Sequence, residues 1–290
     1  MSAQAGARLA LVAGSAGRSR RTARIVAFVG LVAALAAYCA HARLYWTWTE
    51  DDAFISFRYA QNVAHGQGFV FNSGERVEGY SNFTWVVIAA AALHGGADPE
   101  QAAKVIGFLA GALAGVLSWL LARRLIGNSG LAALIGPFHV AISPVLVQHA
   151  VNGRETALFA VLLVGAVLLA TGPPALWRRL SLVATLVLLA MTRPEGPLFA
   201  LVILAVRAMQ MRSNNRTWRP ALLDVAAFSV LFGAYFLWRW SYFGLPFPNT
   251  FYAKTQGGTH GLIDGAQYGL DFLRDSGGVL FVALAAAPWL

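Results

Sequence analysis

Three consecutive acidic residues, Glu50, Asp51 and Asp52, directly follow the first long apolar run of the chain. Carboxylates so close to hydrocarbon are costly unless they face water, a metal ion or a partner charge. Neighbouring residues on a helix point about 100° apart, so one aspartate can face a cavity while the other caps the following helix. Two interpretations therefore stay open. One is a helix cap, and the other is a general base or a ligand of a hard cation such as Mg²⁺, Mn²⁺ or Ca²⁺.

Two further segments each place an arginine beside a glutamate at the edge of an apolar stretch. "GRETALF" contains Arg154 and Glu155, and "TRPEGPLF" contains Arg193 and Glu195. An ion pair that stabilises a helix end is a sufficient explanation for Glu155. Arg193 lies at the expected tip of a hairpin between short apolar arms, where a guanidinium group can bind an anionic phosphate.

A third segment, "PNTFYAK", offers Lys254 as a second phosphate-binding cation, with Asn249 and Tyr252 as binders of sugar hydroxyl groups. The alternative is an anchor of aromatic residues and lysine at the membrane interface. The single cysteine, Cys39, excludes an internal disulfide and a cysteine-based zinc site. The histidines show no spacing typical of metal ligands, so the ligands of any bound metal ion would be carboxylates.

The composition of the chain indicates the class of protein in which these residues are placed. Of 290 residues, 58% are hydrophobic and only 12% are charged, about half the charged fraction of a soluble domain. The formal net charge is +9, but the basic residues cluster at the ends of apolar runs, as in membrane proteins that follow the positive-inside rule. We therefore expect an all-α, polytopic membrane protein that does not bind nucleic acid.

The apolar runs predict how the chain crosses the membrane. The first run follows a basic tail, residues 1–24, and reads better as an uncleaved transmembrane helix than as a cleaved signal peptide. Pro137 and Pro144 are expected to kink one of the later helices. The predicted spans are 25–46, 102–121, 131–150 and 157–170, a hairpin of 180–191 and 197–206, and 221–240.

The basic flanks predict the orientation. With the tail in the cytoplasm, residues 47–101 form the first outer loop, which contains two helices on the membrane surface, around 54–63 and 83–94. Four charged clusters then gather on the outer face. They are Glu50/Asp51/Asp52, Arg154/Glu155, Arg193/Glu195 and Lys254.

The motifs "DDAFISFRYAQNVAHGQGFVFNSGERVEGYSNFTW", "VNGRETALF", "TRPEG" and "PNTFYAK" occur in this order between residues 46 and 254. As a set they resemble the integral-membrane glycosyltransferases of the GT-C fold, and among these the arabinofuranosyltransferases of the mycobacterial cell envelope. The resemblance implies a helical bundle with juxtamembrane helices in its first periplasmic loop, in the bacterial inner membrane. It also implies an inverting enzyme that moves a sugar from a polyprenyl-phosphate donor to a glycan or lipid acceptor on the periplasmic side.

Carried over residue by residue, the resemblance assigns catalysis to Asp51 and Asp52. It implies phosphate-binding cations at Arg193 and Lys254, supported by Arg58 or Arg154. Together with the reading of the motifs, this gives a set of candidate substrate-binding residues: Glu155, Glu195, Asn249 and Tyr252.

This sequence departs from the family pattern in two ways. It has "GRET" where the family commonly has Gly-Met/Leu-Glu-Thr, so Arg154 adds a charge, and it stops within an apolar run, residues 277–290, as an incomplete member would. Two other classes of protein would also place charges near a membrane. One is a transporter or flippase of an anionic lipid-linked substrate, which inverted repeats would favour, and none are found. The other is a non-catalytic membrane assembly protein.

Overall fold

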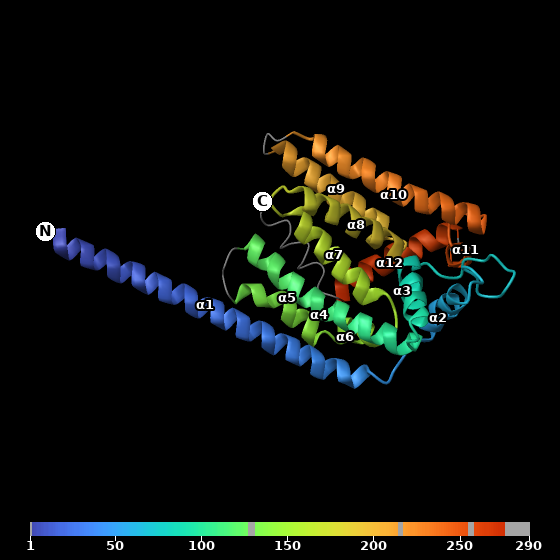
Figure 1. The fold of residues 1–290 in the computed structure, drawn as a ribbon, viewed down its shortest axis with the longest axis horizontal. Helices are drawn as coiled ribbons and strands as arrows, with labels where there is room; N and C mark the ends of the chain where they lie inside the picture. The colour runs from blue at the N-terminus through green and yellow to red at the C-terminus, as the bar shows by residue number, and fades with distance from the viewer. Residues whose placement is uncertain (1, 127–130, 214–216, 255–257, 276–290) are drawn as a thin grey trace. The chain divides into compact units, whose positions relative to one another are not determined.

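The computed structural model describes residues 2–126, 131–213, 217–254 and 258–275, and every regular element in these ranges is helical. The prediction of an all-α protein is confirmed (Figure 1). The chain divides into two units, Met1–Gly244 and Leu245–Leu290, which are described separately. The helices are α1 (Ser2–Tyr45), α2 (Asp51–Ala64), α3 (Phe83–His94), α4 (Pro99–Leu125), the 3-10 turn η1 (Ala132–Leu134), α5 (Ile135–Ile142), α6 (Pro144–Val151), α7 (Thr156–Ala170), α8 (Leu176–Thr192), α9 (Gly196–Ser213), α10 (Arg219–Phe243), α11 (Asn249–Lys254) and α12 (Gly258–Asp275).

Among the described residues, three helices are long and apolar enough to cross a membrane. They are Arg21–Tyr45 within α1, Pro99–Leu125 (α4) and Arg219–Phe243 (α10). Each coincides with a predicted span, so the prediction of a polytopic membrane protein is confirmed. The start of α4 is set locally, because Asp98 accepts a hydrogen bond from the Gln101 amide at 2.9 Å and Pro99 occupies the first helical position.

The predicted span 131–150 forms two helices that are apolar and long enough to cross a membrane only when taken together. Ala132–Ile142 and Pro144–Val151 meet at a bend of 60°. The break was expected because proline lacks an amide hydrogen and cannot continue a helix. It lies at Pro144, where the Ser143 hydroxyl caps α6 by accepting from the Leu146 amide at 3.4 Å. Helix α5 runs through Pro137 without a break, because this residue lies in its first turn.

Helices α7, α8 and α9 are shorter and pack side by side, α7 on α4 and α8, and α8 on α9. Their shared core is aliphatic, with Leu182, Leu186 and Leu189 fully buried. The apolar runs predicted these helices, but α8 and α9 extend further than expected into the basic residues beside them. Helix α7 has 15 residues and is therefore roughly 22 Å long, so its two ends are well separated sites.

The two helices predicted in the first outer loop, α2 and α3, both form and pack against each other. The intervening loop, residues 66–82, is fastened to α2 by side chains. Asn62 donates to the Val70 carbonyl at 2.7 Å. The Tyr59 hydroxyl donates to the Val77 carbonyl at 2.6 Å and accepts from the Gly79 amide at 2.8 Å. Their position on the membrane surface stays a prediction.

The same loop is also fastened to α10. Glu78 and Arg239 are both buried, and Arg239 Nε lies 2.8 Å and 2.9 Å from the two carboxylate oxygens. Burial raises the pKa of Glu78 above its ordinary value, and the Arg239 guanidinium opposes this rise. Burial likewise raises the pKa of the Tyr59 and Tyr80 hydroxyl groups. The charged pair is therefore buried near tyrosine side chains, and it holds the loop against α10.

Candidate functional site

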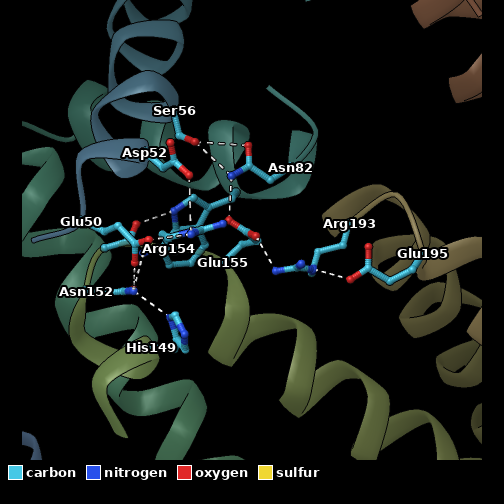
Figure 2. A network of polar contacts seen from close by, with 12 residues as sticks. Glu50, Asp52, Ser56, Asn82, His149, Asn152, Arg154, Glu155, Arg193 and Glu195 are labelled. Carbon is cyan, nitrogen blue, oxygen red and sulfur yellow. Dashed lines mark hydrogen bonds and ion pairs between the residues drawn. The ribbon is translucent and has the colours of Figure 1, made fainter. Parts of the chain in front are cut away.

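Ten polar residues from four separate parts of the chain form two sets of contacts that meet at the adjacent residues Arg154 and Glu155, and we call them together the polar network (Figure 2). They come from α2 and the residue before it, the residue before α3, the end of α6 with the turn that follows, and the turn between α8 and α9. The polar network consists of Glu50, Asp52, Ser56, Asn82, His149, Asn152, Arg154, Glu155, Arg193 and Glu195. Three of the four charged clusters that were predicted to share one face are therefore in contact.

Asn152 connects Glu50 to the turn before α7. Its amide nitrogen donates to Glu50 Oε2 at 2.7 Å, and its backbone carbonyl accepts from the Glu50 amide at 3.0 Å. Its side-chain oxygen accepts from the Arg154 amide at 3.1 Å, which fixes the orientation of the amide group. The amide nitrogen also lies 2.9 Å from His149 Nδ1, which brings the end of α6 into the same set of contacts.

Gly153 allows the turn to pass close to α2. Its φ of +90° is unfavourable for a residue with a side chain, and an added Cβ would lie 3.1 Å from Ala53 Cβ and 3.3 Å from Phe57 Cζ. Its carbonyl accepts from Trp85 Nε1 at 2.9 Å, which joins α3 to the same turn. The glycine of the "GRET" motif is thus required by the backbone, and it sets the positions of Arg154 and Glu155.

Glu155 is 6% exposed and links α3 to the α8–α9 turn. One carboxylate oxygen accepts from Asn82 at 2.8 Å, and Asn82 also exchanges hydrogen bonds with Ser56. The other oxygen accepts from Arg193 Nη1 at 3.0 Å. Arg193 in turn donates from Nε to Glu195 at 2.6 Å. Glu155 is therefore held on both sides, as a buried carboxylate requires.

Asp51 and Asp52 are exposed at the first turn of α2, at the edge of the polar network. The residue at the N-cap is Glu50, so the interpretation of either aspartate as the cap is wrong. Their negative charges are nevertheless favourable at the N-terminus of a helix. The Asp51 carboxylate accepts from the Asp52 amide at 2.9 Å, and Asp52 Oδ2 lies 3.6 Å from Arg154 Nη1. The side chain of Asp52 is 59% exposed, which leaves its carboxylate open to a ligand.

The ion pairs of the polar network already engage both arginines. Arg154 Nη1 lies 2.8 Å from Glu50 Oε1, and Arg193 lies between Glu155 and Glu195. Four carboxylates thus face two guanidinium groups, so the network as it stands carries excess negative charge. Within the described residues, no group of three or more His, Cys, Asp or Glu side chains is placed to hold a metal ion.

Of the remaining predicted site residues, Arg58 belongs to the first unit and the others to the second unit. Arg58 donates from Nε to the Phe71 carbonyl at 3.0 Å, on the loop between α2 and α3. Asn249 and Tyr252 belong to α11 in the second unit. Lys254 is the last residue of α11, and its side chain lies outside the described residues.

Sequence reasoning missed a buried lysine beside the site. Lys104 of α4 is 2% exposed, donates to the Trp46 carbonyl at 2.9 Å and lies 2.9 Å from Glu100 Oε1. The same glutamate oxygen accepts from the Thr49 hydroxyl at 2.5 Å, next to Glu50. The sequence did contain a sign of this residue's importance. Lys104 lies inside a predicted span, where a charged side chain is rare and has a partner or a function. The neutral members of the polar network carry no comparable signal.

Comparison with known proteins finds an enzyme that is similar to the chain in sequence. The terminal β-(1→2)-arabinofuranosyltransferase of Mycobacterium tuberculosis is 30% identical to the chain over 230 residues. The chain is thus related to a glycosyltransferase. The matched region is 73% of the chain but 35% of the arabinofuranosyltransferase, so the chain spans about a third of that enzyme's length. No family model and no solved structure matches the chain.

Proposed function

We propose that this chain contains the catalytic face of an inverting membrane glycosyltransferase of the GT-C type. In this proposal it moves an arabinofuranosyl or hexosyl group from a polyprenyl-phosphate donor to a glycan or lipid acceptor of the cell envelope, on the periplasmic side of the inner membrane. The similarity to the arabinofuranosyltransferase supports the reaction class. The observation that carries the proposal is the position of Asp51 and Asp52, both exposed, beside a network whose other charged side chains are paired with one another.

The proposed step uses one of these aspartates as the base. The acceptor hydroxyl oxygen attacks the anomeric carbon, and its proton passes to the carboxylate of Asp51 or Asp52. The bond between the anomeric carbon and the phosphate oxygen breaks, and polyprenyl phosphate leaves with the electron pair. Attack from the face opposite the leaving group inverts the anomeric carbon. Negative charge grows on the phosphate during this step, so a fixed cation would accelerate it.

The charge of the polar network limits which groups can supply that cation. Arg154 and Arg193 are each paired with carboxylates, so either would have to exchange a partner before it could bind phosphate. Lys254 is a further candidate from the sequence. If a divalent cation accompanies the donor phosphate, Asp51 and Asp52 are the carboxylates that would hold it, with the phosphate as a further ligand, and it would stabilise the leaving charge.

The test measures sugar transfer by the purified chain in detergent, with a panel of radiolabelled polyprenyl-phosphate sugars. Asp51→Asn, Asp52→Asn and the double variant are compared with Glu75→Gln, which removes an exposed carboxylate from the loop between α2 and α3, outside the polar network. Loss of the base is expected to lower transfer by about 100-fold or more in one single variant and in the double variant. Donor binding and transfer by Glu75→Gln should be unchanged.

The outcomes separate the roles of the two aspartates. If Asp51→Asn abolishes transfer and Asp52→Asn does not, Asp51 is the base, and the reverse result selects Asp52. Full transfer by the double variant would exclude both. If the wild type binds a donor that it does not transfer, repeating the assay with added Mg²⁺, Mn²⁺ or Ca²⁺ tests the cation. A chain that neither binds nor transfers any sugar of the panel under these conditions would contradict the proposal.

A further inference from the structure

The other end of α7 carries a second charged cluster. A pocket of about 300 Å³ lies between the segment 170–174 and α9, where Arg207, Gln210 and Met211 line it. Glu155 of the polar network stands at the beginning of α7, and the pocket stands at its end, roughly 22 Å away. The pocket is therefore separate from the candidate catalytic face.

Arg207 is the charged side chain in the wall of the pocket, and it is only 6% exposed. Its Nε lies 3.3 Å from Asp224 Oδ2, yet neither atom makes a hydrogen bond within the described part of the chain. Its Nη1 reaches the Ala170 carbonyl at a long 3.4 Å. The other oxygen of Asp224 accepts from Arg179 at 2.9 Å. The Asp224 carboxylate is thus shared by two arginines, and its contact with Arg207 is longer than its contact with Arg179.

Two more arginines, Arg178 and Arg124, lie beside one glycine of the pocket wall. Gly172 lines the pocket, and a Cβ built there would overlap Arg178 Nη1 and would lie 3.2 Å from Arg124 Nη1. Arg124 also donates to the Leu168 carbonyl at the end of α7, where a cation is favourable. The basic pocket, as we call this site, therefore has Arg207 in its wall and Arg124 and Arg178 beside its Gly172, while Arg179 shares the Asp224 carboxylate with Arg207.

We propose that the basic pocket binds the phosphate group of an anionic membrane lipid. The four arginines outnumber the one carboxylate beside them, and this excess of guanidinium charge fits a phosphate group, which guanidinium groups bind in a bidentate way. The surroundings fit a lipid, because Leu176, Trp177 and Trp218 are 68%, 59% and 61% exposed at the helix ends. Exposed tryptophans are typical of the membrane interface, and basic pockets between membrane helices bind acidic headgroups. This proposal does not depend on the proposed transfer reaction.

The experiment uses the full chain in detergent and records its melting temperature and, by native mass spectrometry, its retained lipid. Dioleoyl phosphatidylglycerol is the probe, dioleoyl phosphatidylcholine is the neutral lipid, and inorganic phosphate is the anion without a tail. Phosphatidylglycerol is expected to raise the melting temperature and to stay bound, and the other two are expected to do neither. Arg178→Gln should weaken phosphatidylglycerol binding about fivefold, the effect of removing one arginine near an anionic lipid.

A matched control is Arg219→Gln, which removes an exposed arginine at the start of α10; unlike Arg178, it is not among the side chains nearest to Gly172 of the pocket wall. It should retain phosphatidylglycerol like the wild type. Arg207→Met combined with Asp224→Leu replaces the buried pair by apolar side chains and should also lose the lipid, whereas a failure of this variant to fold leaves Arg178→Gln as the deciding variant. Equal losses in Arg178→Gln and Arg219→Gln, or stabilisation by phosphate alone equal to that by lipid, would overturn the proposal.

Discussion

Arg193 donates from Nη1 to Glu155 Oε1 at 3.0 Å, across 38 residues of sequence. The arginine lies in the turn between α8 and α9, and the glutamate immediately precedes α7, so this contact joins the two turns. Sequence reasoning assigned Arg193 to a donor phosphate. In the structure its guanidinium group is occupied by Glu155 and Glu195 (Figure 2). We therefore expect Arg193 to contribute to the stability of the site as well as to any binding of phosphate.

The first prediction concerns this pair. Arg193→Gln leaves the buried Glu155 carboxylate with only Asn82 as its side-chain partner, and we expect it to cost about 2 kcal/mol, between the values for exposed and fully buried pairs. Glu195→Gln, which changes the more exposed partner, should cost clearly less. Thermal unfolding in detergent measures both variants.

A double variant separates stability from binding. In Glu155→Gln/Arg193→Gln no buried charge is left unpaired, so most of the lost stability should return. If Arg193 also binds the donor phosphate, donor affinity should stay low in the double variant. A melting temperature that stays at the level of Arg193→Gln would contradict the structural role.

The second prediction concerns Asn152, which is fully buried and donates to Glu50 at 2.7 Å. Asn152→Ala removes its hydrogen bonds and should cost about 2–3 kcal/mol. Asn152→Asp keeps the shape but points a carboxylate at that of Glu50, so it should be the less stable of the two at neutral pH. Because protonation removes the repulsion, acidification should raise its melting temperature relative to Asn152→Ala. Equal responses of the two variants to pH would be inconsistent with the assigned orientation of the amide.

The sequence was sufficient to predict the helices because long apolar runs with basic flanks form few structures other than membrane-spanning helices. It also predicted that Asp52, Arg154 and Arg193 lie at one end of the bundle, since alternating spans return the chain to the same face. It did not predict which side chains pair. Asn82, for example, joins Ser56 to Glu155, and nothing in the sequence distinguishes it from other asparagines.

Two pairings could have been suspected. Lys104 and Arg239 both lie inside predicted spans, and a charge in a span requires a partner. The partners themselves depend on packing, because Glu78 meets Arg239 across 161 residues. Hydropathy shows that such a charge is unusual, but only the folded chain shows which carboxylate satisfies it.

The third prediction concerns Tyr80, which is 3% exposed and whose hydroxyl finds no hydrogen-bond partner among the residues described. Its ring packs against Tyr59 at a centroid distance of 4.7 Å, so the aromatic contact does not need the hydroxyl. Tyr80→Phe removes a buried, unsatisfied polar group and should stabilise the chain by about 1 kcal/mol. The gain should increase above pH 10, because burial raises the pKa of this phenol and the folded wild type resists ionisation that the unfolded chain undergoes. A lower melting temperature for Tyr80→Phe would indicate a partner for the hydroxyl, such as a buried water.

The fourth prediction concerns the pH dependence of the Glu78–Arg239 pair. Because burial raises the pKa of Glu78 above 4.5, the folded chain binds a proton more readily than the unfolded chain in the range just above that value. Stability must then fall as pH rises through this range, since the unfolded state releases the proton first. The melting temperature of the wild type should decline relative to that of Glu78→Gln from about pH 4.5 upward.

Two comparisons decide whether Glu78 causes this decline. Glu75→Gln removes an exposed carboxylate from the same loop and should leave the wild-type pH profile unchanged. Arg239→Gln removes the cation that lowers the pKa of Glu78, so the decline should become steeper and extend to higher pH. A wild-type profile that rises over this range relative to Glu78→Gln would show instead that the guanidinium outweighs burial. In that case Glu78 would be ionised in the folded chain at a lower pH than in the unfolded chain.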